Sequence, residues 1–308
     1  MKIGWCLPDV KGTGSGGIKT IIDIVKYLSK FHDQVLTIPH TDRPVIEHYY
    51  GNLPDNVTVQ RHFDDDYDLL IATWWETAKA VRLASAKHRA YFIQDSEYMF
   101  YPASSNYYKA KETYSYGLTP ITMGRWLGKH FESSYSIDFC VDTDIYKDLG
   151  KQKDSLCFLY QPQKPHRLAE IGLEALKIVK QSLPELKIWC YGSNPCGDDE
   201  KRYPEFDFLG QLSLTGCNLL YNKCKLGVCF SATNPSRIPF EMMSAGCQPL
   251  DINNYDDYNG SVFVSKPNVN IIAQDILKYF GKTLPMDTPK SLDYASEHFT
   301  QIVGAICA

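Results

Sequence analysis

Apolar residues follow two alternating patterns along the chain. Short apolar runs, typical of buried parallel strands, alternate with stretches in which apolar residues recur every three or four positions, as on one face of a helix. The predicted strands are 2–7, 34–38, 56–59, 69–72, 90–93, 121–123, 156–160, 187–191, 206–210, 226–230 and 248–252. The predicted helices are 18–31, 76–87, 105–116, 124–131, 168–183, 214–224, 238–245 and 291–306. This alternation predicts an α/β protein with parallel sheets and right-handed crossovers.

The alternation is interrupted by a polar stretch at residues 142–154, which includes Gly150-Lys151-Gln152-Lys153-Asp154 and has the composition of a linker. We therefore predict two Rossmann-like domains, residues 1–150 and 151–290, whose sheets face each other across a cleft. Parallel sheets of this type bind ligands at the carboxyl ends of their strands. The final segment, 291–308, is predicted to be a helix that can pack back on the N-terminal domain.

Length and charge are consistent with this organisation. The 308 residues suit about two domains. The net charge of −4, from 32 basic and 36 acidic residues, lacks the basic excess of a dedicated nucleic-acid binder. No apolar run approaches the roughly 20 residues that span a bilayer, and the apolar run that meets Pro8 is too short for a signal-peptide core. We expect a cytoplasmic protein, and peripheral contact with the inner face of a membrane stays open.

The ten cysteines form no Cys-x-x-Cys pair, so the sequence predicts neither a zinc ribbon nor a thioredoxin-like motif. Several lie inside apolar runs, such as Cys157 and Cys229. We expect most of the cysteines to be inert, reduced core residues, and we expect no metal site.

A glycine-rich turn, Gly12-Thr13-Gly14-Ser15-Gly16-Gly17, follows the first predicted strand and opens a helix. Gly16 and Gly17 allow close backbone approach to a ligand, and a helix N-terminus favours an anion. The turn lacks the Lys-Ser/Thr ending of a P-loop and does not match the dinucleotide Gly-x-Gly-x-x-Gly pattern. A purely structural strand-to-helix turn remains an equal alternative.

The segment from Ser231 to Gly246 gives a sharper signal, because it follows a buried strand and begins a helix. Ser236 is a suitable N-cap, and Pro239 falls in the first turn, where its missing N–H costs little. Glu241 lies about one turn further, where its carboxylate can accept hydrogen bonds from sugar hydroxyls. A strand, a helix start and an acidic residue in this order indicate a nucleotide-sugar site.

The segment Cys229–Gly246 resembles the donor-binding segment of GT-B glycosyltransferases of family 4, in particular the branch that contains L-rhamnosyltransferases of bacterial surface polysaccharides. Three further stretches resemble segments of that branch: Gly14–Thr20, Tyr91–Pro102 and Phe158–Gly172. The resemblance implies an acceptor site in the N-terminal domain, a nucleotide-sugar site in the C-terminal domain and transfer with retention of configuration. It also implies that no metal or other cofactor is required.

The resemblance assigns roles to individual residues. Glu241 would bind the nucleotide ribose, and Arg167 would stabilise the departing diphosphate electrostatically. The donor-binding set is Gly16, Gly17, Gln161, Arg167, Gly192, Ser236, Arg237, Ile238 and Glu241. Two positions depart from the family pattern: Thr233 replaces a second Glu that normally contacts the donor sugar, and Gln161 stands where an Arg is common. Because of these departures, the sequence does not predict which sugar the donor carries. It also offers the diphosphate one cation fewer than is common in the family.

The N-terminal candidates follow the strand that ends at Ile93. We expect Asp95 to orient the acceptor hydroxyl or to take its proton, with capping of the next segment as the alternative, and Glu97 is a weaker catalytic candidate. Seven of the 21 tyrosines fall between residues 91 and 116. A tyrosine ring suits a sugar, so Tyr98 and Tyr101 are the predicted acceptor-binding residues, although ordinary packing accounts for at least half of the group.

The sequence therefore predicts an enzyme, a glycosyltransferase that uses a UDP or dTDP donor. The resemblance to the rhamnosyltransferase branch favours dTDP-L-rhamnose as the donor, with UDP-hexoses as the alternative. The predicted acceptor is a glycan or lipid-linked glycan. Two alternatives stay open: a nucleotide-sugar epimerase, and a catalytically degenerate GT-B module that binds sugar nucleotides or partner proteins.

Overall fold

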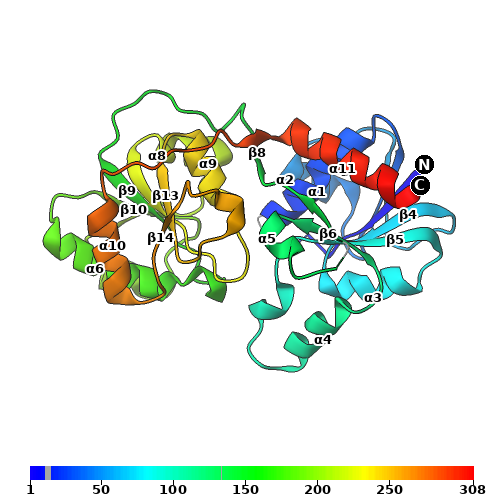
Figure 1. Cartoon of the computed structure of the whole chain (residues 1–308), viewed down its shortest axis with the longest axis horizontal. Helices are drawn as coiled ribbons and strands as arrows, with labels where there is room; N and C mark the ends of the chain where they lie inside the picture. Colours follow the sequence, from blue (N-terminus) through cyan, green and yellow to red (C-terminus); the bar gives the residue numbers. More distant parts are fainter. Residues whose placement is uncertain (11–14, 133) are drawn as a thin grey trace. The chain divides into compact units, whose positions relative to one another are not determined.

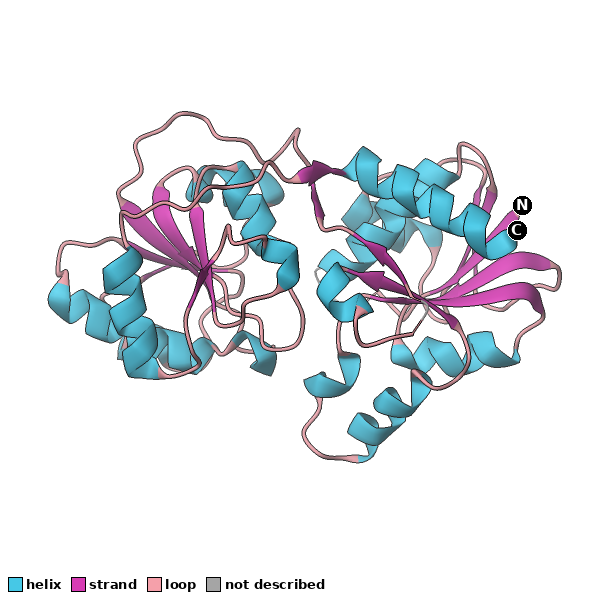
Figure 2. Ribbon diagram, in the orientation of Figure 1, coloured by secondary structure: helices cyan, strands magenta, loops and turns pink. Residues whose placement is uncertain are grey.

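The computed structural model describes residues 1–10, 15–132 and 134–308 (Figure 1). It divides into two compact units: unit 1 contains Met1–Asp138 and Leu292–Ala308, and unit 2 contains Phe139–Ser291. Each unit is a parallel β-sheet with helices on both faces (Figure 2), so the predicted α/β class is confirmed.

Unit 1 is built on a seven-stranded sheet of order β3-β2-β1-β4-β5-β6-β7, all parallel. The strands are β1 (Lys2–Cys6), β2 (Asp33–Thr37), β3 (Val57–Gln60), β4 (Tyr67–Ala72), β5 (Ala86–Ile93), β6 (Thr119–Met123) and β7 (Tyr135–Ile137). The helices are α1 (Gly16–Leu28), α2 (Arg43–Tyr50), α3 (Trp75–Leu83), the 3-10 turn η1 (Glu97–Phe100), α4 (Ser105–Thr113), α5 (Arg125–Gly128) and α11 (Leu292–Cys307).

Alternate residues of the central strands pack on opposite faces of this sheet. Trp5 contacts Phe299 of α11, with ring centroids 5.2 Å apart, and α11 also packs against α1. The neighbouring residue Cys6 belongs instead to the cluster that contains Ala78 and Val81 of α3. The C-terminal helix is therefore an integral part of unit 1.

Unit 2 contains a six-stranded parallel sheet of order β11-β10-β9-β12-β13-β14 and a two-stranded sheet of β8 and β15. The strands are β8 (Cys140–Val141), β9 (Ser155–Leu159), β10 (Ile188–Tyr191), β11 (Asp207–Phe208), β12 (Cys224–Val228), β13 (Gln248–Asp251), β14 (Phe263–Val264) and β15 (Lys290–Ser291). The helices are η2 (Pro165–Arg167), α6 (Ala169–Ser182), α7 (Asp199–Arg202), α8 (Leu214–Tyr221), α9 (Ile238–Ser244), η3 (Asp256–Tyr258) and α10 (Val269–Tyr279).

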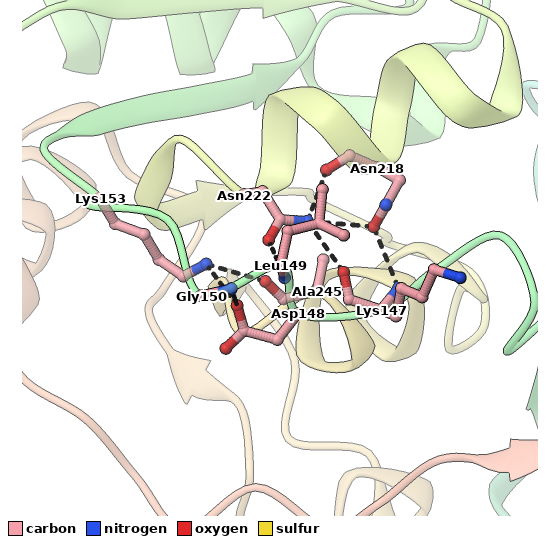
Figure 3. Close-up of polar contacts among 8 residues, drawn as sticks. All are labelled: Lys147, Asp148, Leu149, Gly150, Lys153, Asn218, Asn222 and Ala245. Atoms are coloured by element: carbon pink, nitrogen blue, oxygen red, sulfur yellow. Dashed lines mark hydrogen bonds and ion pairs between the residues drawn. The ribbon is translucent and has the colours of Figure 1, made fainter.

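The polar stretch that the sequence presents as a linker is fixed to unit 2 (Figure 3). The side chain of Asn218 accepts the backbone N–H of Lys147, and that of Asn222 accepts the backbone N–H of Leu149. Lys153 donates to the carbonyl of Ala245 at 2.9 Å. Because these bonds tie the stretch to α8 and the end of α9, the division between the units follows Asp138 rather than residue 150.

Several elements differ from the sequence prediction. The predicted helix 76–87 ends at Leu83, and Lys87 lies in β5. The pattern did not predict this part of the strand, because residues 87–89 are polar and none of them is fully buried. The pattern missed α2, which buries only Ile46 and Tyr50, and it also missed α10. Of the predicted glycine turn, Gly12–Gly14 lie outside the described residues.

Candidate functional site

In both large sheets the strand that comes first in the chain lies beside the one that comes fourth, so the chain leaves these two strands in opposite directions. Such a topological switch point opens a crevice at the carboxyl ends of the strands, where α/β proteins bind ligands. In unit 2 the switch point lies between β9 and β12. Ligand-binding residues are therefore expected in the segments that follow β9 and β12.

Arg167 connects the two segments at the unit 2 switch point. Its Nη1 donates to the carbonyl of Phe230 at 3.1 Å, and its Nη2 donates to Ser236 Oγ at 3.3 Å. The backbone supports this contact, because Ala232 N–H donates to the carbonyl of His166 at 3.1 Å. The next residue, Leu168, has a φ of +49°, a left-handed conformation that is uncommon for leucine and concentrates at functional sites.

Arg167 Nε and Thr233 Oγ1, in the segments after β9 and β12, are buried without a hydrogen-bond partner among the described residues. Buried polar atoms in folded proteins nearly always have partners, so unsatisfied groups need an explanation. A bound polar ligand would supply the missing partners. Burial, followed by the charges of Arg167 and Lys164, lowers the pKa of His166 to about 3, so this imidazole is neutral. Arg167 and Lys164 are the cations that an anion would meet here.

Asp251, at the end of β13, fixes the loop that follows β12. Its Oδ1 accepts the backbone N–H of Ser231 at 2.8 Å and that of Ile252 at 2.7 Å, and its Oδ2 accepts the hydroxyl of Tyr258 at 2.6 Å. Burial raises the pKa of Asp251 to about 6, against the lowering effect of these bonds and of Arg167. Sequence reasoning missed this residue, although an aspartate that ends a buried strand beside the donor segment was a usable signal.

Glu241 lies in α9 and is 7% exposed. Burial raises the pKa of its carboxyl, while nearby Arg237 and a hydrogen bond from the Tyr146 hydroxyl act in the opposite direction. The N-cap of α9 is Arg237 and not the predicted Ser236, but Ser236 Oγ still accepts the N–H of Ile238 at 3.3 Å. The predicted residues Ser236, Arg237, Ile238 and Glu241 thus occupy one short segment beside Arg167.

Gln161 and Gly192 lie together at the carboxyl ends of β9 and β10. Gly192 has a φ of +110°, and a Cβ added there would lie 3.2 Å from Gln161 Cγ and 3.2 Å from the carbonyl oxygen of Tyr160. The glycine is therefore required by both the backbone conformation and the close approach. The predicted donor residues Gly16 and Gly17 belong to unit 1, where Gln94 Nε2 donates to the carbonyl of Gly17 at 3.2 Å.

Glu97, in unit 1, is buried and takes part in a local hydrogen-bond network through Oε2 and its backbone N–H. Its Oε2 accepts the backbone N–H of Trp75 at 2.6 Å and the hydroxyl of Tyr91 at 2.8 Å, and its own N–H donates to the Tyr114 hydroxyl at 2.9 Å. Burial raises the pKa of Glu97 to about 8, so the carboxyl is mostly protonated at neutral pH. Asp95 remains half-buried, and its Oδ1 accepts the N–H of Ser96 at 2.7 Å.

Tyr98 and Tyr101 are half-buried members of an aromatic cluster. The Tyr98 ring packs edge-on against Tyr107 and Tyr114, with centroid distances of 5.4 and 6.0 Å. The Tyr101 hydroxyl accepts the indole N–H of Trp75 at 3.1 Å. These contacts account for part of the tyrosine excess as packing, while both rings keep some exposed surface.

Within residues 1–10, 15–132 and 134–308, no three His, Cys, Asp or Glu side chains are grouped so as to hold a metal ion. All ten cysteines are free, and seven of them are buried. No helix in the described ranges is long and apolar enough to cross a membrane.

One family model and one relative match parts of this chain. Residues 154–277 match the family described as WsaF, C-terminal domain. The chain is 30% identical over 193 residues to the O-antigen biosynthesis protein RfbC of Myxococcus xanthus, an alignment that covers 58% of this chain and 15% of RfbC. The chain thus spans a small part of that relative's length.

Solved structures share the fold across nearly the whole chain. Anabaena HepE, in complex with UDP and glucose, is 16% identical with a TM-score of 0.65 and coverage of 99% of this chain and 95% of HepE. A mutant of S. aureus TarM, in complex with fondaparinux, α-GlcNAc-glycerol and UDP, is 10% identical with a TM-score of 0.70 and coverage of 99% and 96%. A UDP-GlcNAc 2-epimerase of Methanocaldococcus jannaschii is 10% identical with a TM-score of 0.62 and coverage of 99% and 100%. The chain has the GT-B fold, as the sequence predicted.

Proposed function

We propose that this chain is a glycosyltransferase that transfers a sugar from a nucleoside-diphosphate donor to a glycan acceptor, with the donor held by unit 2. The observation that carries the proposal is Arg167, which joins the segments after β9 and β12 and keeps a buried Nε without a partner among the described residues. The match to the WsaF C-terminal domain covers the same segments, and the HepE and TarM structures are complexes that contain UDP.

The chemistry of transfer explains why a half-buried guanidinium is placed there. As the bond between the sugar and the diphosphate breaks, negative charge grows on the leaving phosphate oxygens. A fixed guanidinium in a water-poor site stabilises that charge without reorganising at the moment of reaction. We assign this role to Arg167. The hydroxyl of Thr233, which is 2% exposed and unpaired among the described residues, would bind the donor phosphate or sugar.

The remaining donor residues complete the proposed site. Glu241 would accept hydrogen bonds from the nucleotide ribose, and Ser236, Arg237 and Ile238 would lie along the diphosphate. Gln161 and Gly192 would border the donor at the ends of β9 and β10. We propose that basic side chains and backbone N–H groups hold the diphosphate without a metal ion.

The acceptor would be bound by unit 1, where Tyr98 and Tyr101 offer partly exposed rings and Asp95 offers a half-buried carboxyl. Asp95 would orient the acceptor hydroxyl, and Gly16 and Gly17 would line the start of α1. Glu97 is better suited to positioning than to proton transfer, because its carboxyl already holds Trp75 and Tyr91.

The donor and the product are proposed more narrowly from the relatives. The name of RfbC supports a role in bacterial surface polysaccharide synthesis. We propose dTDP-L-rhamnose or a UDP-hexose as donor, retention of anomeric configuration, and a glycan or lipid-linked glycan as acceptor. Membership of family 4 and of its rhamnosyltransferase branch is part of this proposal.

An epimerase is the second candidate, because the M. jannaschii UDP-GlcNAc 2-epimerase shares the fold. A panel of UDP-glucose, UDP-GlcNAc and dTDP-L-rhamnose, incubated with and without glycan acceptors, separates the possibilities by chromatography of the nucleotides. Release of UDP or dTDP that depends on an acceptor supports transfer, whereas an isomerised donor without acceptor supports epimerisation.

The control variants for this experiment are Arg167→Gln, expected to lose turnover, and Arg202→Gln, which removes an exposed guanidinium of the same unit. If no donor is consumed and no nucleotide binds at millimolar concentration, the proposal is wrong. Nucleotide binding without any turnover would instead favour a degenerate binding module.

A further inference from the structure

Unit 1 contains a cavity of about 450 Å³ at the amino ends of β5 and β6, whereas Gly17, Asp95 and Glu97 follow the carboxyl ends of their strands. The cavity is lined by the start of β5, by the segment that leads into β6, by Arg82 of α3, by Tyr135 of β7 and by the end of α11. None of these lining residues has a role in the proposed transfer reaction, so the cavity is a separate feature of the molecule.

The strand register explains why a cavity forms here. Pairing between β5 and β6 begins at Ala90 and Thr119. The earlier residues of β5, Ala86–Arg89, therefore extend beyond the start of β6, while β4 still pairs with them on the other side. The sheet thus has a notch beside the first residues of β5, Ala86–Arg89, and side chains from that part of the strand line it.

The lining of this cavity is strongly basic. Arg82, Lys87, His88 and Arg89 contribute to it, together with the hydroxyl-bearing Tyr116 and Thr119, and no acidic residue lines it. Lys87 is neutralised by an ion pair with Asp68 at 2.7 Å. The two arginines have no carboxylate partner among the described residues, and both guanidinium groups stay charged at any physiological pH.

The arginines are also held in place. The Arg82 guanidinium lies over the Tyr116 ring, 4.8 Å from its centroid, and Arg89 donates through Nε and Nη2 to the carbonyl of Ala84 at 3.0 and 2.8 Å. Guanidinium groups bind phosphate oxygens through paired N–H donors. We propose that this cavity, which we call the β5 notch, binds a phosphate-bearing anion, with Arg82 and Arg89 as its principal cations.

A phosphate of this kind can come from a free phosphorylated molecule or from a lipid headgroup. The volume exceeds that of a single phosphate and falls in the range of small-molecule sites. Leu83, next to Arg82 in the chain, is an apolar side chain that is 76% exposed and so is available to contact a lipid surface. The two sources share the same recognition chemistry and are separated by experiment.

The first test titrates inorganic pyrophosphate into the full chain carrying Arg167→Gln, which disables the proposed donor site. We expect binding that weakens about tenfold or more in Arg82→Gln/Arg89→Gln. Lys30→Gln/Lys201→Gln removes the same charge from exposed positions elsewhere and should bind like the parent. If the double variant does not fold because the Arg89 bonds to the Ala84 carbonyl are lost, Arg82→Gln alone is used. It keeps those bonds and should still weaken pyrophosphate binding.

The second test measures co-sedimentation with vesicles of phosphatidylcholine, with and without phosphatidylglycerol. A lipid source predicts binding that requires phosphatidylglycerol and is reduced by Arg82→Gln and by Leu83→Ser. A free source predicts pyrophosphate binding and no vesicle binding. The proposal is overturned if neither probe binds, or if the notch variants and the Lys30/Lys201 control behave alike. Since neither test measures sugar transfer, its outcome is independent of the proposed function.

Discussion

Arg167 Nη2 lies 3.3 Å from Ser236 Oγ, so the segment that follows β9 is held directly to the segment that follows β12. This contact spans the switch point of the unit 2 sheet, where ligands of doubly wound proteins bind. It also places the predicted phosphate-binding cation beside the start of α9.

Asp251 should be essential for the shape of the donor loop. Asp251→Ala leaves the buried N–H groups of Ser231 and Ile252 without their acceptor. We expect the free energy of unfolding to fall by about 2–4 kcal/mol, measured by urea denaturation. The exposed residue Asp207 provides the matched control, and Asp207→Ala should change stability by less than about 0.5 kcal/mol. Equal effects of the two substitutions would contradict the anchoring role of Asp251.

Glu241 should contribute to nucleotide affinity. Glu241→Gln keeps an acceptor for the Tyr146 hydroxyl but removes the negative charge, so the fold of α9 is preserved while bonds to ribose hydroxyls weaken. We expect UDP to bind about tenfold more weakly, because hydrogen bonds to a charged group are worth about 1.5–3 kcal/mol. Titration calorimetry measures this directly. An unchanged UDP affinity would remove Glu241 from the proposed ribose site.

Glu97 should make stability depend on pH. Its pKa in the folded chain, about 8, lies above the ordinary value of 4.5, so folding favours the protonated form. The stabilisation is complete below about pH 4.5 and is lost as the pH rises through 8. Between pH 5.5 and 8.5 the free energy of unfolding of the wild-type chain should fall by on the order of 3 kcal/mol more than that of Glu97→Gln. Urea denaturation at the two pH values measures this difference.

The control for this pH dependence is Glu112→Gln, which changes an exposed carboxyl of α4 and should leave the wild-type profile unaltered. If Glu97→Gln and the wild-type chain show parallel pH profiles, the buried carboxyl does not titrate as described.

Tyr98 and Tyr101 should affect the acceptor more than the donor. Replacing both by alanine removes the partly exposed rings, and we expect the acceptor KM to rise about fivefold or more while UDP affinity stays within about twofold. Tyr98→Phe/Tyr101→Phe keeps the rings and should restore most of the acceptor affinity. A parallel loss of acceptor and donor binding would show that the two rings serve packing alone.

Much of the fold is predictable from the sequence because buried parallel strands contain continuous apolar runs, as at residues 156–159 and 226–228. The fixed position of the stretch 147–153 could not be predicted, because it rests on side-chain amides from Asn218 and Asn222, distant in sequence. A polar segment looks like a linker until such partners are known.

The candidate site was predictable only where a local motif carries it. The strand-to-helix pattern predicts the segment from Ser236 to Glu241, and the resemblance predicts Arg167. In the structure Arg167 donates to Ser236 of that segment. Asp251 and the β5 notch were missed, since each depends on contacts between separate strands. The burial of Glu97 was also invisible, because its acidic side chain suggests exposure and its partners come from β5 and the start of α3.

The central claim is that unit 2 binds a nucleoside diphosphate around Arg167. Titration calorimetry of UDP and dTDP against the wild-type chain, Arg167→Gln and Arg202→Gln tests it most directly. We predict that at least one nucleotide binds the wild-type chain and Arg202→Gln alike, and that Arg167→Gln weakens this binding about tenfold or more. Absence of binding to the wild-type chain at millimolar nucleotide, or equal affinity in Arg167→Gln, would contradict the account.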